Sequence, residues 1–294
     1  MTPAPRRPLK GSGGKGRPPG GRPGGRRPGS GPGQGRPDRR SGPGPNTLGG
    51  DQIEGRRAVL ALLEARARPV QRVAMAAELD PSEQLDRIEA LCRRDHIPLE
   101  VIPKARLERI ALTESHQGVL ARARSLKPVP LEDLMVPELS VQPFLLVCDG
   151  LTDPHNLGSL LRSAEGAGVT GVVLPRHRSV RISPTVAKVA AGAIEHLRFC
   201  LVPGIPAALE QLGKAGIETV GLAGEAKRSL WATPLTDLPV ALVIGSEEKG
   251  LAPLTRKRCS ALASIPQVGS IESLNASVAG GIALFEVARQ RTLG

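Results

Sequence analysis

The chain has 294 residues and a formal net charge of +12, and most of that charge is confined to one end. Residues 1–50 contain 16 of the 35 glycines, 11 of the 28 prolines and eleven Lys/Arg against a single acid, Asp38, so the rest of the chain is near +2. With almost nothing apolar to bury, this stretch is predicted to be a disordered basic tail. The tail lacks the apolar core of a signal peptide, and no apolar run of ~18 residues occurs, so we expect neither a signal peptide nor a membrane-spanning helix.

The tail has two open interpretations. A Gly/Arg-rich polycation can tether RNA without sequence preference, because each neutralised phosphate releases counterions. The alternative is a solubilising extension without a binding role.

The cysteines and histidines are too widely spaced to suggest a metal site or a disulfide framework. The four cysteines are Cys92, Cys148, Cys200 and Cys259, and no CxxC, HExxH or Cys/His cluster occurs among them or the five histidines. We therefore expect no metal and a cytoplasmic location.

Residues 51–126 are predicted to form a small α/β domain. The expected elements are, in chain order, a helix at 55–63, a strand at 72–76, a helix at 82–95, a strand at 98–102, a short helix at 104–110 and a closing strand at 118–123. Residues 127–142 contain several prolines and are predicted to be a linker.

Residues 143–294 are predicted to form a second α/β domain, built on a parallel sheet. Strands of the buried type recur at 144–148, 171–174, 199–202, 218–222, 241–245 and 261–265, with helices or loops between them. Parallel sheets bind ligands at the carboxyl ends of their strands. The segments after these strands are therefore where a site is expected.

Residues 166–171 match the dinucleotide fingerprint GxGxxG only as a string of letters. The fingerprint requires a strand before it and a helix after it, and here the predicted order is reversed. These glycines are expected to end a helix, which disfavours a dehydrogenase.

The first informative block is 149–162, where a polar turn leads into a helix. On that helix Asn156, Ser159 and Arg162 share the arc opposite Leu157 and Leu160. Taken alone, Asn156 could be a helix cap and Arg162 a solvated surface charge.

The second block, 242–251, places Glu247 just beyond a strand and between Gly245 and Gly250. Glycines permit close approach of the backbone to a ligand, although a plain turn would also explain them.

The third block, 264–281, runs from a strand through a polar loop into a long terminal helix. Ser273 and Asn275 could simply cap that helix. Its residues Val278, Ile282 and Phe285 have core spacing. The pair 280–281, both glycine, indicates close packing against a ligand or a partner subunit.

Together the three blocks resemble the ordered motifs of the SpoU–TrmH family, knotted RNA ribose methyltransferases of the SPOUT class. The motifs are Asn156-x-Gly158-Ser159-x-x-Arg162, then Gly245-Ser246-Glu247-x-x-Gly250-Leu251, then Ile265-Pro266-x-x-Gly269-x-x-x-Ser273-Leu274-Asn275. Residues 51–126, with their Gly55-Arg56-Arg57 and His116-Gln117-Gly118 segments, resemble the ribosomal-protein-like substrate-binding domain found in this family.

The resemblance implies a deep trefoil knot, S-adenosylmethionine as methyl donor and a homodimer whose interface includes the terminal helix. It implies methylation of a ribose 2′-hydroxyl in ribosomal RNA, most like the members that modify a guanosine in the peptidyl-transferase region of the large subunit. The implied catalytic residues are Arg162, Asn156, Glu247, Ser273 and Asn275. The implied cofactor-binding residues are Gly245, Ile265 and Leu274.

Arg162 has two possible roles in such a site, as a base or as an electrostatic clamp on the RNA phosphate. Neutralising a free guanidinium at pH 7 costs roughly 7 kcal/mol, which favours the clamp. One departure from the family pattern is Glu248, where glycine is usual; we expect a locally different turn with activity retained.

Three rival interpretations are weighed against this one. The RNA could be transfer RNA, or a ribosomal loop whose methylation confers antibiotic resistance. The protein could instead be a non-catalytic RNA-binding factor for ribosome assembly, which the intact set of motif residues disfavours.

Overall fold

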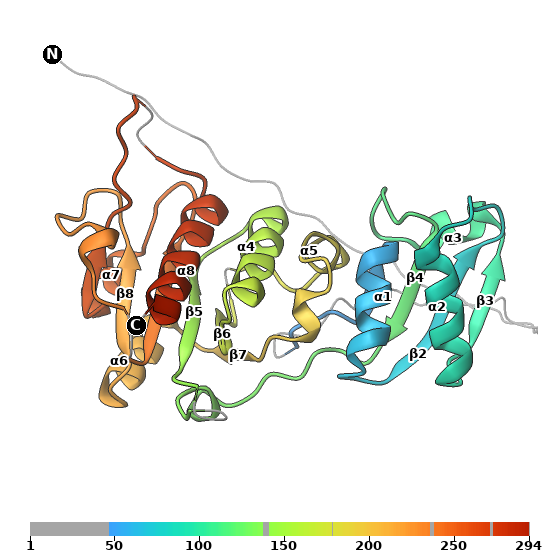
Figure 1. Ribbon diagram of the computed structural model, residues 1–294, viewed down its shortest axis with the longest axis horizontal. Helices are drawn as coiled ribbons and strands as arrows, with labels where there is room; N and C mark the ends of the chain where they lie inside the picture. Colours follow the sequence, from blue (N-terminus) through green and yellow to red (C-terminus); the bar gives the residue numbers. More distant parts are fainter. Residues whose placement is uncertain (1–46, 138–140, 178, 236–237, 271–272, 294) are drawn as a thin grey trace, which may run out of the picture. The chain divides into compact units, whose positions relative to one another are not determined.

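A computed structural model describes residues 47–137, 141–177, 179–235, 238–270 and 273–293, which form an α/β fold with two sheets (Figure 1). The first sheet and its helices comprise β1 (Gln52–Glu54), α1 (Arg56–Ala65), β2 (Val70–Ala76), α2 (Glu83–Arg94), β3 (Leu99–Ile102), α3 (Lys104–Ile110) and β4 (Val119–Ala123). The second sheet and its helices follow as η1 (Glu132–Leu134), β5 (Phe144–Asp149), α4 (Pro154–Gly166), β6 (Gly171–Pro175), α5 (Pro184–Val189), η2 (Ala193–Glu195), β7 (Phe199–Val202), α6 (Ile205–Lys214), β8 (Glu218–Leu222), η3 (Leu230–Ala232), β9 (Val240–Gly245), α7 (Pro253–Arg258), β10 (Ala261–Ala263) and α8 (Ala276–Leu293).

The first sheet has the strand order β1-β4-β2-β3, antiparallel except for the β2–β3 pair. Its helices follow the apolar spacing of the sequence. In α2, for example, Ser82 caps the first turn by accepting from the backbone N–H of Leu85. The one strand absent from the sequence predictions is β1, whose three residues are too few to show an alternating pattern.

The expected disordered tail lies largely outside the described residues, but its last four residues belong to the fold. Leu48 is fully buried, and the backbone N–H of Gly50 donates to the carbonyl of Ile182 at 2.7 Å. The prediction that the tail extends to residue 50 is therefore wrong at its end, because the burial of Leu48 offsets the entropy of ordering these residues.

The second sheet is wholly parallel, with the strand order β10-β8-β9-β5-β6-β7. Alternate residues of β5 enter different apolar clusters: Leu146 packs with residues of α4 and α8, whereas Leu145 packs with residues of α6. Helices thus cover both faces: α6 packs on β5, α8 packs on β9, and Figure 1 shows α4 beside α8. The predicted fold class is confirmed, and the trefoil knot stays a prediction.

The GxGxxG string forms the end of a helix, as predicted. Helix α4 ends at Gly166, Gly168 adopts φ 79°, and β6 begins at Gly171. The backbone here turns from helix into strand, the reverse of a dinucleotide-binding loop.

The segment predicted as a linker packs against the second sheet where it is described. The backbone N–H of Val129 donates to the carbonyl of Phe199 in β7 at 2.8 Å, and Leu131 and Leu134 are buried. A Cβ built on Gly171 would lie 2.7 Å from Leu134, so this segment touches the sheet closely.

Helix α8 buries a different face from the one expected. Val278, Ile282 and Phe285 are 50%, 37% and 52% exposed, so the prediction that they are core residues is wrong. The buried residues of α8 include Ala283, Leu284 and Val287. Both sets have helical spacing, because the helix is apolar nearly all round and periodicity alone cannot choose its core face.

The glycine pair in α8 permits close packing on α4 of the same chain. A Cβ on Gly280 would lie 2.4 Å from Leu160 Cδ1, and one on Gly281 would lie 3.3 Å from Ser163 Oγ. Within the ranges that the structure describes, no helix is both long and apolar enough to cross a bilayer.

The four cysteines are free thiols, and burial raises the pKa of each. The pKa is raised to about 12 for Cys148 and to about 11 for Cys92, Cys200 and Cys259, in each case chiefly by loss of hydration. A raised thiol pKa suppresses the reactive thiolate at pH 8. We expect the native protein to react slowly with DTNB, and all four thiols to react promptly in guanidinium chloride; a fast-reacting native thiol would contradict this.

Candidate functional site

A cavity of about 340 Å³ lies where three neighbouring parallel strands end. It is bordered by the carboxyl ends of β8, β9 and β10 and by the start of α8, as expected for a parallel sheet. Its lining residues are Leu222, Ala223, Gly224, Glu225, Ile244, Gly245, Ser246, Glu247, Glu248, Lys249, Gly250, Leu251, Arg256, Ala263, Ile265, Gln267, Ser273, Leu274, Ala276 and Ala279.

All three predicted cofactor residues line this cavity, namely Gly245, Ile265 and Leu274. Of the predicted catalytic residues, Glu247 and Ser273 line it too, and both are exposed. The cavity thus joins segments from 222–225 to 273–279 of the sequence.

A tight turn after β9 forms one wall of the cavity. The backbone N–H of Ser246 donates to the carbonyl of Gly250 at 3.0 Å, and the N–H of Gly250 donates to the carbonyl of Ser246 at 2.9 Å. A Cβ on Gly245 would lie 2.1 Å from the Gly250 carbonyl carbon, so only glycine fits there. The Ala252 N–H donates to Asp149 at 2.8 Å, which ties the segment after this turn to the end of β5.

A network of polar side chains joins that turn to α4 and α8. Asn156 Nδ2 donates to Glu247 Oε1 at 2.6 Å, and Asn156 Oδ1 accepts from Asn275 Nδ2 at 2.9 Å. Ser277 Oγ lies 3.3 Å from Asn156 Oδ1 and 2.7 Å from Asn275 Oδ1. The structure therefore brings Asn156, Glu247 and Asn275 together.

The two helix-cap alternatives have different outcomes. Helix α4 is capped by Asp153, whose carboxylate accepts from the N–H groups of His155 and Asn156, so the side chain of Asn156 is free for the network. Asn275 does cap α8, accepting from the Ser277 N–H at 2.9 Å, while its amide nitrogen reaches Asn156. Its capping and its place in the network are thus compatible.

The variant Asn156→Asp is expected to weaken binding of S-adenosylmethionine, the methyl donor that the family resemblance implies, about tenfold. It replaces an amide donor with a second carboxylate facing Glu247, and repulsion should displace the turn after β9. The double variant Asn156→Asp/Glu247→Gln restores a donor opposite an acceptor and should recover most of the affinity. Calorimetric titration measures both; equal affinity in the wild type and the single variant would contradict the coupling.

Arg162 lies apart from the network. It is exposed on α4 and does not line the cavity, and its guanidinium has no hydrogen bond or ion pair with any described residue. It lies six positions after Asn156, which is roughly 9 Å along a helix axis. Its guanidinium is therefore available to an external anion.

Sequence reasoning missed the contribution of β8. Leu222, Ala223, Gly224 and Glu225 follow that strand and line the cavity, and Arg256 of α7 pairs with Glu225 at its border. The available signal was positional: β8 ends at the same edge of the sheet as β9 and β10.

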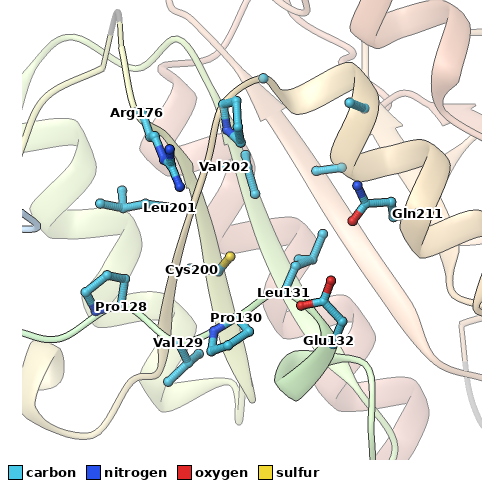
Figure 2. A pocket seen from close by; sticks show the side chains of 14 residues that line it. Pro128, Val129, Pro130, Leu131, Glu132, Arg176, Cys200, Leu201, Val202 and Gln211 are labelled. Atoms are coloured by element: carbon cyan, nitrogen blue, oxygen red, sulfur yellow. The ribbon is translucent and has the colours of Figure 1, made fainter. Parts of the chain in front are cut away.

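A second cavity, of about 450 Å³, lies between the segment at 128–132, β7 and α6. Figure 2 shows Arg176, Gln211 and Glu132 around it. None of the predicted site residues lines this cavity. The polar network lies elsewhere, at the turn after β9 and the starts of α4 and α8, so this cavity is not assigned as the active site. Among the described residues, no group of His, Cys, Asp or Glu is arranged to hold a metal ion.

Two family models match the chain. Residues 143–285 match the SpoU rRNA Methylase family, and residues 52–129 match the model described as RNA 2′-O ribose methyltransferase substrate binding. The first match contains every predicted site residue.

Curated relatives match over most of their length. The chain is 41% identical to the 23S rRNA (guanosine-2′-O-)-methyltransferase RlmB of Ralstonia nicotianae, over 80% of this chain and 94% of that protein. It is 40% identical to the RlmB of Escherichia coli strain K12, over 82% of this chain and 99% of that protein.

A solved structure shares the fold. The SpoU methyltransferase AviRb from Streptomyces viridochromogenes, crystallised with its cofactor AdoMet, is 25% identical and superposes with a TM-score of 0.69. The match covers 83% of this chain and 91% of that one.

Proposed function

This chain belongs to the SpoU rRNA Methylase family, and from that premise we propose that it methylates the ribose 2′-oxygen of a guanosine in 23S rRNA. The methyl donor is S-adenosylmethionine. The observation that carries the proposal is the cavity at the ends of β8, β9 and β10, which is lined by residues of the second and third motifs, while Asn156 of the first motif bonds to Glu247 in its lining. A ribosomal RNA substrate would place the reaction in the cytoplasm.

The cavity suits the chemistry of this donor. Leu222, Ile265 and Leu274 offer apolar surface for an adenine ring, and its volume is within the usual range for small-molecule sites. The lining carries the carboxylates of Glu225, Glu247 and Glu248 against the cations of Lys249 and Arg256, and Arg256 pairs with Glu225. The remaining net negative charge favours a ligand with a positively charged sulfur and ammonium group.

The protein's task is chiefly alignment and proton removal. When bound, S-adenosylmethionine supplies a methyl group that is already activated on a sulfonium sulfur. The chain must therefore hold the ribose oxygen in line and help its proton to leave. We assign Arg162 as a clamp on the RNA phosphate and as a stabiliser of the developing alkoxide. Asn156, Glu247, Ser273 and Asn275 orient the ribose and the loops around it.

The direct test is a map of ribose methylation across total RNA from strains with and without the gene. We expect one guanosine of 23S rRNA to lose its methyl group in the deletion strain. Loss of a methyl group from transfer RNA instead would redirect the proposal to that substrate. If calorimetry detects no binding of S-adenosylmethionine at millimolar concentration, the non-catalytic RNA-binding alternative gains support.

We also propose a homodimer that uses the exposed face of α8. Val278, Ile282 and Phe285 form an apolar stripe with i, i+4, i+7 spacing, and exposing such a contiguous stripe to water is unfavourable. The stripe adjoins α4, since a Cβ on Gly166 would lie 3.6 Å from Phe285. A second copy on this face would thus lie close to the helix that carries Arg162.

The variant Ile282→Glu/Phe285→Glu is expected to convert the dimer to a monomer, because two carboxylates would be desolvated in the interface. Light scattering after gel filtration measures the mass. The matched control Val101→Glu changes an exposed valine of β3, far from α8 in the sequence, and should leave the mass unchanged. A monomeric wild type would contradict the dimer.

A further inference from the structure

Arg68 and Glu195 form a buried ion pair between the two family-matched regions. Arg68 Nε donates to Glu195 Oε2 at 2.8 Å, and Arg68 Nη2 donates to Oε1 at 2.7 Å. Their side chains are only 7% and 1% exposed. Such a bidentate ion pair fixes the relative orientation of the two side chains as well as their distance, because each nitrogen must face its own carboxylate oxygen at the same time.

The remaining guanidinium nitrogen holds the ends of the first sheet. Arg68 Nη1 donates to the backbone carbonyls of Gly50 and Arg124. Gly50 precedes β1 and Arg124 follows β4, so these are the points where the chain enters and leaves that region. One side chain therefore joins both connections of the substrate-binding region to Glu195.

Glu195 is in turn linked by packing to the helix that carries catalytic residues. It ends η2, shortly after α5, and α5 packs on α4: a Cβ on Gly158 would lie 2.7 Å from Val189 Cβ. On the side of the substrate-binding region, a Cβ on Gly192, which directly precedes η2, would lie 2.2 Å from the Cβ of Ala61 in α1. Such close packing transmits a displacement of Glu195 toward α4.

We propose that Arg68 and Glu195 are positioning residues, which set the angle at which RNA held by residues 52–129 meets the site on α4. A buried ion pair adds little to stability, since desolvation offsets the attraction, yet it permits few alternative arrangements. The pair touches neither the methyl donor's cavity nor the polar network. This inference rests on the proposed function.

The test compares two RNAs on the full-length enzyme. One is a long 23S rRNA fragment that the wild type methylates, and the other is the shortest hairpin around the same nucleotide that it still methylates. The main variant is Arg68→Lys, which keeps the charge beside Glu195 but cannot bond both carboxylate oxygens and two carbonyls together. We expect the KM for the long fragment to rise at least tenfold, with the hairpin KM and the Kd for S-adenosylmethionine unchanged.

Glu195→Gln is the second variant and should raise the same KM, and the double variant Arg68→Met/Glu195→Leu separates orientation from stability. It removes both buried charges, so it should regain part of the thermal stability lost by Glu195→Gln, although the carbonyls of Gly50 and Arg124 lose their donor. It should not regain the KM. The control Glu64→Gln disrupts an exposed pair with Arg87 and should change nothing.

The proposal is overturned if Arg68→Lys and Glu195→Gln keep the wild-type KM for the long fragment. It is also overturned if the loss is equal on the hairpin, or if the double variant regains KM together with stability. A wild type that methylates neither RNA would refute the proposed function instead.

Discussion

Arg162→Ala is expected to lower kcat for RNA methylation by about 10²–10³-fold, the size of effect seen when one stabiliser of a developing anion is removed. Arg162 is exposed on α4, outside the donor's cavity, and has no partner among the described residues. The Kd for S-adenosylmethionine should therefore stay within about twofold of the wild type. Single-turnover rates with saturating donor, together with calorimetry, separate the two quantities.

Arg162→Lys refines this expectation. Lysine keeps the positive charge but lacks the planar fork that grips two phosphate oxygens, so most of the rate should still be lost. Near-normal turnover by Arg162→Lys would exclude the clamp. A large loss of donor affinity in Arg162→Ala would show instead that Arg162 belongs to the cavity.

Gly245→Ala is expected to weaken binding of S-adenosylmethionine at least about 100-fold, which corresponds to about 2.8 kcal/mol. The added methyl group would lie 2.1 Å from the carbonyl carbon and 2.3 Å from the carbonyl oxygen of Gly250. Those are backbone atoms, so relief requires the turn after β9 to open, and with it one wall of the cavity. Calorimetric titration measures the loss.

Gly213→Ala is the matched control. Gly213 lies in α6, does not line the strand-end cavity, and a Cβ there meets nothing within 4 Å, so donor affinity should stay within about twofold of the wild type. Similar losses in the two variants would mean that the loss does not come from the turn after β9. Unchanged affinity in Gly245→Ala would remove this turn from the site.

The parallel sheet and the convergence of its strand ends could be predicted because they follow from local pattern plus one geometric rule. Buried strands that alternate with helices indicate a parallel sheet, and parallel strands end at one edge. The residues Gly245, Ile265 and Leu274 came from the family resemblance, and the positions of Gly245 and Ile265 at or just after the ends of β9 and β10 agree with that rule. The contribution of β8 to the cavity was missed because the residues after this strand form no motif beyond the single glycine Gly224.

Other features depend on contacts that no local pattern records. Helix α8 is apolar on two faces, and only its tertiary packing, where Gly280 meets Leu160 of α4 and Ile244 of β9, decides that Ala283 is buried and Phe285 exposed. The same limit applies to Arg68 and Glu195, whose 127-residue separation gives no spacing signal. The sequence allowed Asn156 to be either the cap of a helix or a site residue, and only the structure shows that Asp153 caps α4.

The most direct measurement of the central claim is a crystal structure of the protein soaked with S-adenosylhomocysteine. We predict that its adenosine lies among Leu222, Gly245, Ile265 and Leu274, with the sulfur directed toward the side where Asn156 and Glu247 meet. Density in the cavity between the 128–132 segment and α6 (Figure 2), with the strand-end cavity empty, would contradict the account.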